Sequence, residues 1–166
     1  SVPVTAFGFL GDRAAAPLTV QAGAPIGVEE GKSLSLVGGD VSISGRTMTA
    51  PGGQITVTSV TGVGEQTVGT RPAGSGVPPA AHGTIQLTSG ATLQTSSQTG
   101  PAGSIFIVGG KFVMDHARLE ANSEGAMPAS LASGVADRAH ISVRADEVAL
   151  HNGTSITAST ASEATA

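Results

Sequence analysis

The stretch SLSLVGGDVSISGRTMTAPGGQITVTSV, residues 33–60, repeats one short alternating segment four times. Leu34, Val41, Met48 and Ile55 stand seven positions apart, and each begins a triplet whose outer residues are apolar or small. Side chains at successive positions of a strand point to opposite faces, so alternation within each triplet indicates a β-strand. The stretch therefore predicts four short strands.

A seven-residue apolar period is also typical of a coiled coil, which needs helix-forming residues between the apolar positions. Here those positions hold mostly Gly, Ser, Thr and Pro, which interrupt helices and favour turns. Short strands joined by glycine-rich corners at a fixed period are typical of a β-solenoid, in which successive coils stack on one another. Three strands of about seven residues each give about 20–21 residues per coil. We therefore expect an all-β solenoid.

The same alternating triplets recur at about the same spacing along the chain, which predicts one coil before residue 33 and further strands after residue 82. The apolar residues that share this phase are predicted to point inward. They are Leu34, Leu36, Val41, Ile43, Ile55, Val57, Ile85, Leu87, Leu93, Ile105, Ile107, Phe112, Leu119, Ile141, Val143, Val148, Leu150 and Ile156.

Two intervals are too long for one coil, and both are rich in Gly, Ala, Ser and Pro. We expect residues 62–82 and 122–137 to be exposed loops inserted at corners, where solenoids tolerate extra residues. The 166 residues then form a single domain with two loop insertions.

Composition excludes several classes of function. The net charge of −4 provides no basic surface for nucleic acid. The chain has no cysteine, so it offers neither disulfides nor thiol chemistry. No apolar run approaches the length of a membrane span.

Parallel β-helices also include polysaccharide-cleaving enzymes, so we searched for converging carboxylates with a basic residue nearby. The best cluster is Asp115, His116, Arg118 and Glu120. Alternation places Arg118 and Glu120 outward, and nothing in adjacent coils complements the cluster, so a solvated surface is favoured over a catalytic site. The same interpretation applies to two further groups, Asp137-Arg138 with His140 and Asp146-Glu147 with His151.

Other motifs also have ordinary interpretations. No pair of histidines has the short spacing of zinc ligands, so structural or surface histidines are favoured. The four are His82, His116, His140 and His151. Gly38-Gly39-Asp40 is not repeated at nine residues, so it predicts a corner and no calcium site. The triplets 47–49 and 56–58 place threonine at alternate positions, which predicts surface threonine on strands and no ice-binding array. Asn152-Gly153-Thr154 matches a glycosylation sequon, but Asn-Gly is a strong turn former and predicts a corner.

Several segments resemble the filamentous haemagglutinin family, the large exoproteins of two-partner secretion, in its cyanobacterial form. They are AFGFLG (6–11), PLTVQ (17–21), LSLVGGDVSI (34–43) and APGGQITVTSV (50–60), of which the last two in succession are the specific part. The later repeats, GSIFIVGGKFVMDHARLEA (103–121) and DEVALHNGTSITAST (146–160), are similar to those that follow that family's secretion domain. The resemblance covers nearly the whole chain apart from the two insertions.

The resemblance implies a right-handed parallel β-helix, secreted to the bacterial cell surface through an outer-membrane transporter partner. The family's Asn-Pro secretion motifs are absent here, so we expect an interior segment of a longer solenoid. The strands predicted in residues 139–160 lack proline and an obvious cap, which predicts either further coils or end-to-end stacking of copies into fibres.

We accordingly expect a non-enzymatic structural or adhesive segment of a secreted exoprotein, acting as a stalk, a filament body or an adhesin. No catalytic, cofactor-binding or metal-binding residue is expected. A surface glycan or a protein is the kind of ligand that the inserted loops would bind. The alternative is a β-helical protein that binds or cleaves polysaccharide.

Overall fold

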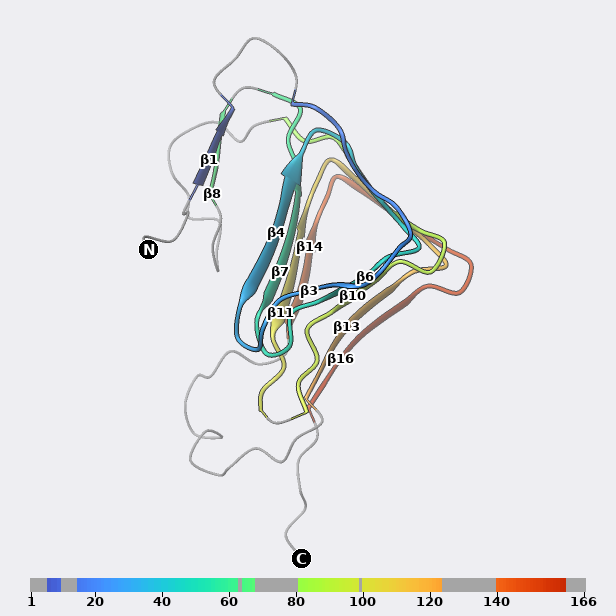
Figure 1. Cartoon of the computed structure of the whole chain (residues 1–166). Helices are drawn as coiled ribbons and strands as arrows, with labels where there is room; N and C mark the ends of the chain where they lie inside the picture. The colour runs from blue at the N-terminus through green and yellow to red at the C-terminus, as the bar shows by residue number, and fades with distance from the viewer. Residues whose placement is uncertain are drawn as a thin grey trace, which may run out of the picture.

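The computed structural model describes residues 6–9, 15–62, 64–67, 81–98, 100–123 and 140–160. These residues form β-strands, turns and connecting segments, and no helix occurs among them. Three parallel sheets enclose a triangular core, and the chain passes through each sheet once per coil (Figure 1). This arrangement is a parallel β-helix, so the expected solenoid with three strands per coil is confirmed.

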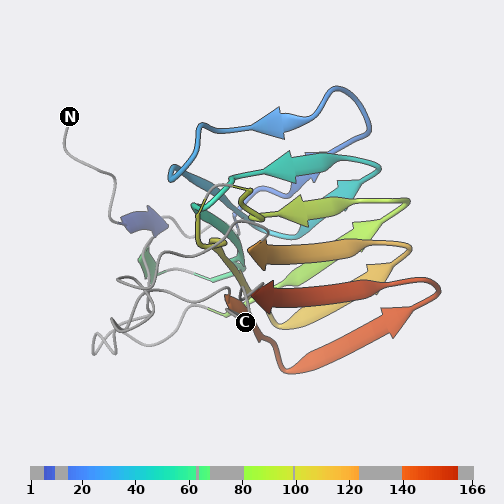
Figure 2. The same cartoon turned by 90° about the horizontal axis from the view of Figure 1, so that it is seen from below.

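Successive coils each add one strand to a sheet, stacked in parallel along the axis, except that the last described coil adds none to sheet III (Figure 2). Sheet I contains β2 (Leu18–Val20), β5 (Val41–Ser44), β9 (Thr84–Thr88), β12 (Lys111–Asp115) and β15 (Glu147–His151). Sheet II contains β3 (Ile26–Gly27), β6 (Thr47–Thr49), β10 (Thr92–Gln94), β13 (Arg118–Ser123) and β16 (Ser155–Thr160). Sheet III contains β4 (Ser33–Gly38), β7 (Gln54–Ser59), β11 (Ser104–Val108) and β14 (His140–Arg144).

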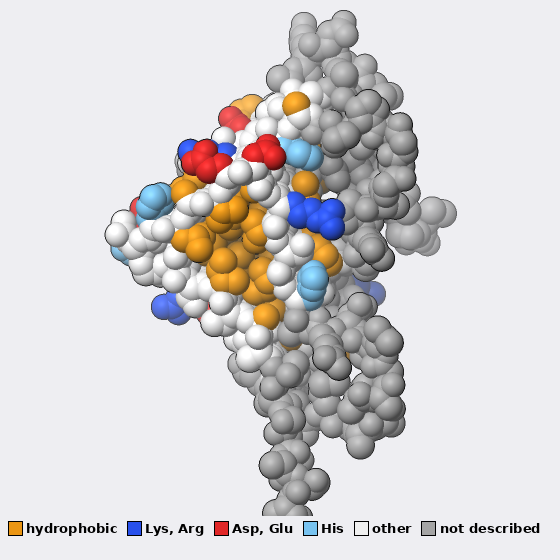
Figure 3. All heavy atoms as spheres, turned by 180° about the vertical axis from the view of Figure 1, so that it is seen from behind, with side chains coloured by type: hydrophobic (Ala, Val, Ile, Leu, Met, Phe, Trp, Pro, Cys, Tyr) orange, Lys and Arg blue, Asp and Glu red, His pale blue; other side chains and the backbone are white. Residues whose placement is uncertain are grey.

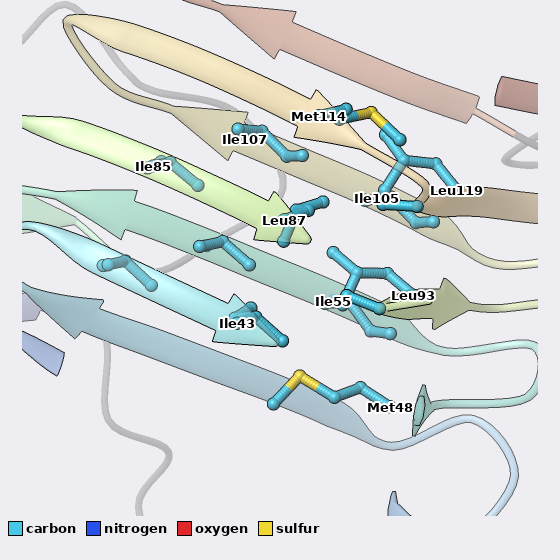
Figure 4. Close-up of a cluster of buried hydrophobic side chains, with 14 of the residues drawn as sticks. Ile43, Met48, Ile55, Ile85, Leu87, Leu93, Ile105, Ile107, Met114 and Leu119 are labelled. Carbon is cyan, nitrogen blue, oxygen red and sulfur yellow. The ribbon is translucent and has the colours of Figure 1, made fainter. Parts of the chain in front are cut away.

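The apolar residues of the sequence repeat form columns inside the triangle, because equivalent positions of successive coils pair in register. In sheet I, Val41 pairs with Ile85, and Phe112 pairs with both Ile85 and Val148. The close-up in Figure 4 shows aliphatic and methionine side chains from successive coils converging on this core. Burial of these columns is the main stabilising contribution of the fold.

The predicted inward set is most deeply buried in the middle of the stack and more exposed toward both of its described ends. Eleven members have at most 1% of their surface exposed: Val41, Ile43, Ile55, Val57, Ile85, Leu87, Leu93, Ile105, Ile107, Phe112 and Leu119. Leu34, Leu36, Ile141 and Val143 are half-buried. Val148, Leu150 and Ile156 are exposed, although each continues a buried column in register. Their exposure therefore reflects the open end of the stack.

The corner between sheets II and III leaves no space for a side chain. A Cβ atom on Gly103 would collide with the backbone of Gly53, and one on Gly53 would collide with the backbone of Lys32. The ladder continues through this corner, since Ser104 N–H donates to the carbonyl of Gly53 at 2.9 Å. Glycine therefore lets successive coils approach closely at this corner.

A fourth sheet, made of two antiparallel strands, lies outside the triangle on the side of sheet III (Figures 1 and 2). In it β1 (Ala6–Phe9) pairs with β8 (Gly64–Thr67). Strand β8 lies within the expected insertion 62–82 and joins none of the three solenoid sheets. Residues 63 and 68–80 lie outside the described residues.

The second expected insertion begins later than predicted. Asn122 and Ser123 belong to β13 and pair with Ser159 and Thr160 of β16, because the parallel ladder continues to the end of both strands. The remainder of the expected loop, residues 124–137, lies outside the described residues.

The threonines of β7 depart from the expected surface position. Thr56 is 6% exposed and Thr58 is 1% exposed, although both point away from the core. Thr56 lies between Ser35 and Phe106 in the ladder and receives a hydrogen bond from Gln54 Nε2 at 2.9 Å. The outward-facing threonines of β7 are thus covered, although they lie outside the apolar core.

Candidate functional site

A polar cleft of about 400 Å³ opens where sheet II turns toward sheet III. Three successive coils supply its walls, so residues far apart in sequence meet there. The lining side chains are Glu30, Thr49, Pro51, Gln94, Ser96, Ser97 and Gln98. Most of the lining side chains carry an amide or a hydroxyl, although their apolar atoms form the larger part of the lining surface, and among the described residues Glu30 is its one ionisable group.

An enlarged corner in the third coil shapes the cleft. Leu93 and Ile105 stand twelve positions apart, whereas Met48 and Ile55 of the preceding coil stand seven apart. The extra residues are held against β13. Ser97 N–H donates to the Asn122 carbonyl at 3.0 Å, and Asn122 N–H donates to Ser96 Oγ at 3.0 Å.

Hydrogen bonds also fix the base of the cleft. Ser97 is 2% exposed, and its hydroxyl lies 3.3 Å from Glu30 Oε1, which links the first and third coils. The same hydroxyl accepts a hydrogen bond from Gly100 N–H at 3.1 Å. These bonds use the Ser97 hydroxyl within the protein, so the groups left for a ligand include the amides of Gln94 and Gln98, which suit a neutral, hydroxyl-rich molecule.

The candidate cluster around Asp115 lies at the corner between sheets I and II. His116 Nδ1 is 2.8 Å from Asp115 Oδ1, and Asn152 Nδ2 donates to the same oxygen at 3.3 Å. His116 is exposed and has a φ of 49°, as its backbone turns this corner in the left-handed region. Arg118 and Glu120 lie on β13 with outward side chains, as the alternation predicts, and the cluster lies at a solvent-exposed corner.

The other candidate residues are dispersed. His140 packs its ring 5.3 Å from the ring of Phe106, and Glu147 forms an exposed ion pair with Lys111 at 2.7 Å. His151 pairs in register with Asp115 on the neighbouring strand. Asp137 and Arg138 lie outside the described residues.

Metal binding has no support in the part of the chain that the structure describes. No group of three or more His, Asp or Glu side chains there could hold an ion. His82 Nδ1 lies 2.7 Å from the Ser59 carbonyl and so helps to close the base of the 62–82 segment.

Two short motifs are corners, as predicted. Asp40 Oδ1 accepts a hydrogen bond from Thr84 N–H at 2.7 Å, which ties the second coil to the third. Asn152 and Gly153 have φ values of 26° and 63°, so both turn the chain in the left-handed region. Both motifs therefore contribute to the folding of the coils.

An apolar surface covers the end of the solenoid formed by β14, β15 and β16, which we call the C face. Val148, Leu150 and Ile156 are 52%, 50% and 41% exposed. Seen from behind, hydrophobic side chains fill the triangular cross-section, with charged and histidine side chains around them (Figure 3). The exposed charged and histidine residues in and between β14 and β15 are His140, Arg144, Asp146, Glu147 and His151.

Sequence reasoning located the C face but missed the cleft. The signal for the cleft was the long interval between Leu93 and Ile105, which the repeat pattern left unexplained. Its walls could not be assigned from sequence, because Glu30 meets Ser97 only through the stacking of coils.

Comparisons with protein-family models, with curated proteins and with solved structures find no match for this chain. Within the described ranges, nothing helical has the length and apolar character of a membrane span.

Proposed function

We propose that this chain is a non-enzymatic structural and adhesive segment of a secreted bacterial surface exoprotein. The observation that carries this proposal is the parallel solenoid whose apolar columns run to an exposed end face. In such a stack each inner strand satisfies its backbone groups through the coils on either side, so the body extends along one axis. This geometry suits a stalk or a filament body.

The resemblance to filamentous haemagglutinin exoproteins supports the same role and adds a location. It rests on residues 34–43 and 50–60, which contain most of β4, β5 and β7 together with the corners that precede β5 and β7. Under this proposal the chain is exported through an outer-membrane two-partner secretion transporter and acts at the cell surface.

A second candidate function is polysaccharide binding, and the polar cleft is the observation that favours it. Its amides and hydroxyls match the hydrogen-bonding groups of a neutral sugar. Cleavage has less support, because glycoside hydrolysis ordinarily uses two carboxyl groups and the described lining contributes only Glu30.

A paired binding and turnover assay separates these functions. The purified chain is run through native gels that contain neutral or acidic polysaccharides, and the same mixtures are analysed for new reducing ends or unsaturated products. Binding at the cleft predicts retardation that Gln94→Ala reduces and Gln86→Ala preserves, since Gln86 is exposed on β9, outside the cleft lining.

A purely structural segment shows neither retardation nor products. Binding to a polysaccharide or to whole bacterial cells without products supports an adhesive role. Release of products that Glu30→Gln abolishes would overturn the non-enzymatic proposal.

A further inference from the structure

The outward face of sheet II is polar from β6 to β16. Its strands pair in parallel and in register, so the outward side chains of successive coils form columns along the solenoid axis (Figure 2). One column, which we call the polar row, consists of Thr49, Gln94, Glu120 and Thr157. The neighbouring column consists of Thr47, Thr92, Arg118 and Ser155.

The other two sheets have no column of this kind on the matching outward positions of their described strands. In sheet I the column that passes through Gln86 ends in Val113 and Ala149. In sheet III the column that passes through Thr56 contains Phe106. An unbroken series of hydroxyl, amide and charged groups across four coils therefore belongs to sheet II.

The polar row begins inside the cleft and leaves it along the axis. Thr49 and Gln94 both line the cleft. Glu120 pairs with Gln94 on the next strand, and Thr157 pairs with Glu120 on the strand after that. Neighbouring strands lie about 4.8 Å apart, so each coil adds one polar group at that interval. The cleft is thus one end of a longer polar surface.

Two groups of the row have no competing partner in the described part of the chain. Neither the Gln94 amide nor the Glu120 carboxylate forms a side-chain hydrogen bond or an ion pair there, and both residues are half-buried. Beside them on β13, Asn122 Oδ1 accepts a hydrogen bond from Ser159 Oγ at 2.9 Å, which holds that amide in place. Gln94 and Glu120 therefore offer both donors and acceptors to a ligand.

We propose that the cleft and the polar row form one extended site for a neutral, linear polysaccharide, whose chain runs along the solenoid axis across β6, β10, β13 and β16. This inference rests on the polysaccharide binding proposed above, and it adds the class of polymer, its direction and the residues that bind it beyond the cleft. Successive sugar units hydrogen-bond Gln94, Glu120 and Thr157, while the apolar atoms of the cleft lining contact the C–H faces of the first units.

Charge selects a neutral polymer. The carboxylates of Glu30 in the cleft and Glu120 in the row both repel the carboxylates of an acidic polysaccharide. Arg118 stands in the neighbouring column and offsets one of these two charges. The surface along the row is accordingly negative by one charge.

The straight row selects an extended polymer. Chains of β-1,4-linked glucose or mannose are extended ribbons, and one sugar unit is close in length to the spacing between two strands. Chains of α-1,4-linked glucose coil, so their successive units leave a straight row. We therefore expect binding to strengthen with chain length for β-1,4-linked sugars only.

The test is isothermal titration calorimetry of the whole 166-residue chain with cello-oligosaccharides and manno-oligosaccharides of two to six units. For at least one of these series, affinity is expected to rise at least about tenfold between two and four units, as the added units reach Glu120 and Thr157, and then to level off. Malto-oligosaccharides are the ligand control for shape, and oligogalacturonides of the same lengths are the control for charge. Both are expected to bind more weakly at four units.

Three variants locate the ligand on the protein. Glu120→Ala is expected to weaken binding of the four-unit chain about fivefold, a typical loss for one hydrogen bond, with a smaller effect on the two-unit chain. Gln94→Ala is expected to weaken both, because Gln94 belongs to the cleft as well as the row. Gln86→Ala on sheet I is the matched control and is expected to change neither. Far-ultraviolet circular dichroism confirms that each variant is folded.

The outcomes separate this inference from the function on which it rests. Affinity that Gln94→Ala lowers but that does not grow with chain length would overturn the extended site and leave binding at the cleft standing. Equal effects of Glu120→Ala on short and long chains would likewise overturn it. Tighter binding of oligogalacturonides would overturn the neutral class of ligand. No binding to any of these sugars would overturn the extended site, and the native-gel assay with whole polysaccharides decides separately whether the cleft binds at all.

Discussion

The open end of the solenoid predicts different costs for one chemical change at two points of the stack. Ile107 and Ile156 both continue inward columns, and both can be shortened to alanine. Ile107 is fully buried between Val57 and Val143, whereas Ile156 contacts one neighbouring coil and is 41% exposed.

The magnitudes follow from burial. Truncation of a fully buried isoleucine loses its transfer free energy and leaves a cavity, so Ile107→Ala is expected to lower the free energy of unfolding by about 2–5 kcal/mol. At Ile156 a large part of the side chain already contacts water, and the vacated space opens to solvent. The expected loss there is roughly 1 kcal/mol, mainly the reduced transfer term.

The assay is urea denaturation followed by far-ultraviolet circular dichroism, because the chain has neither tryptophan nor tyrosine for fluorescence. The protein is kept dilute so that association does not contribute to stability. Solenoids can lose end coils separately, so hydrogen exchange of β11 and β16 amides accompanies the denaturation curves. Equal losses for the two variants in dilute solution would refute the conclusion that the last described coil is open.

Three further substitutions test the packing within the stack, each by the shift in the urea midpoint. Gly103→Ala is expected to lower the free energy of unfolding by more than about 1–3 kcal/mol, the usual range for overpacking, because the added Cβ atom would meet backbone. Gly90→Ala is expected to cost about 1–2 kcal/mol, because Gly90 has a φ of 84° but open space around it. A larger cost at Gly90 than at Gly103 would contradict the close approach of coils. Ser59→Ala is expected to cost about 1–3 kcal/mol, because the buried hydroxyl donates to the Gly39 carbonyl at 2.6 Å and accepts from Gly83 N–H at 2.9 Å; no change would show that these bonds are dispensable. Thr95→Val is expected to raise stability by about 1 kcal/mol, since the fully buried hydroxyl has no hydrogen-bond partner among the described residues; a loss would indicate that the hydroxyl is satisfied.

The sequence by itself determined most strands of the three solenoid sheets, their inward faces and several corners, whereas β8 and the end of β13 fell in segments predicted as loops. Alternation at Val41, Ile55 and Ile105 is a local signal, because a strand exposes successive side chains to opposite sides whatever lies around it. Glycine at residues 53 and 103 marked corners for a similarly local reason, the absence of a Cβ atom.

Only the tertiary structure decided which coil residues meet across the stack. Thr56 and Thr58 looked like surface residues, and their burial is a property of the folded chain that their own sequence does not indicate. The pairing of β1 with β8 joins segments far apart in the chain, and no periodicity in either segment specified that partner. The cleft likewise requires Glu30 of the first coil beside Ser97 of the third.

The C face shows both contributions. Sequence phase assigned Val148, Leu150 and Ile156 to inward columns, and the register of the ladders agrees. Their exposure was decided by stacking, because a residue of a solenoid is buried only when coils lie on both sides of it. Periodicity specifies the direction in which a side chain points, and only the assembled stack determines whether another coil covers it.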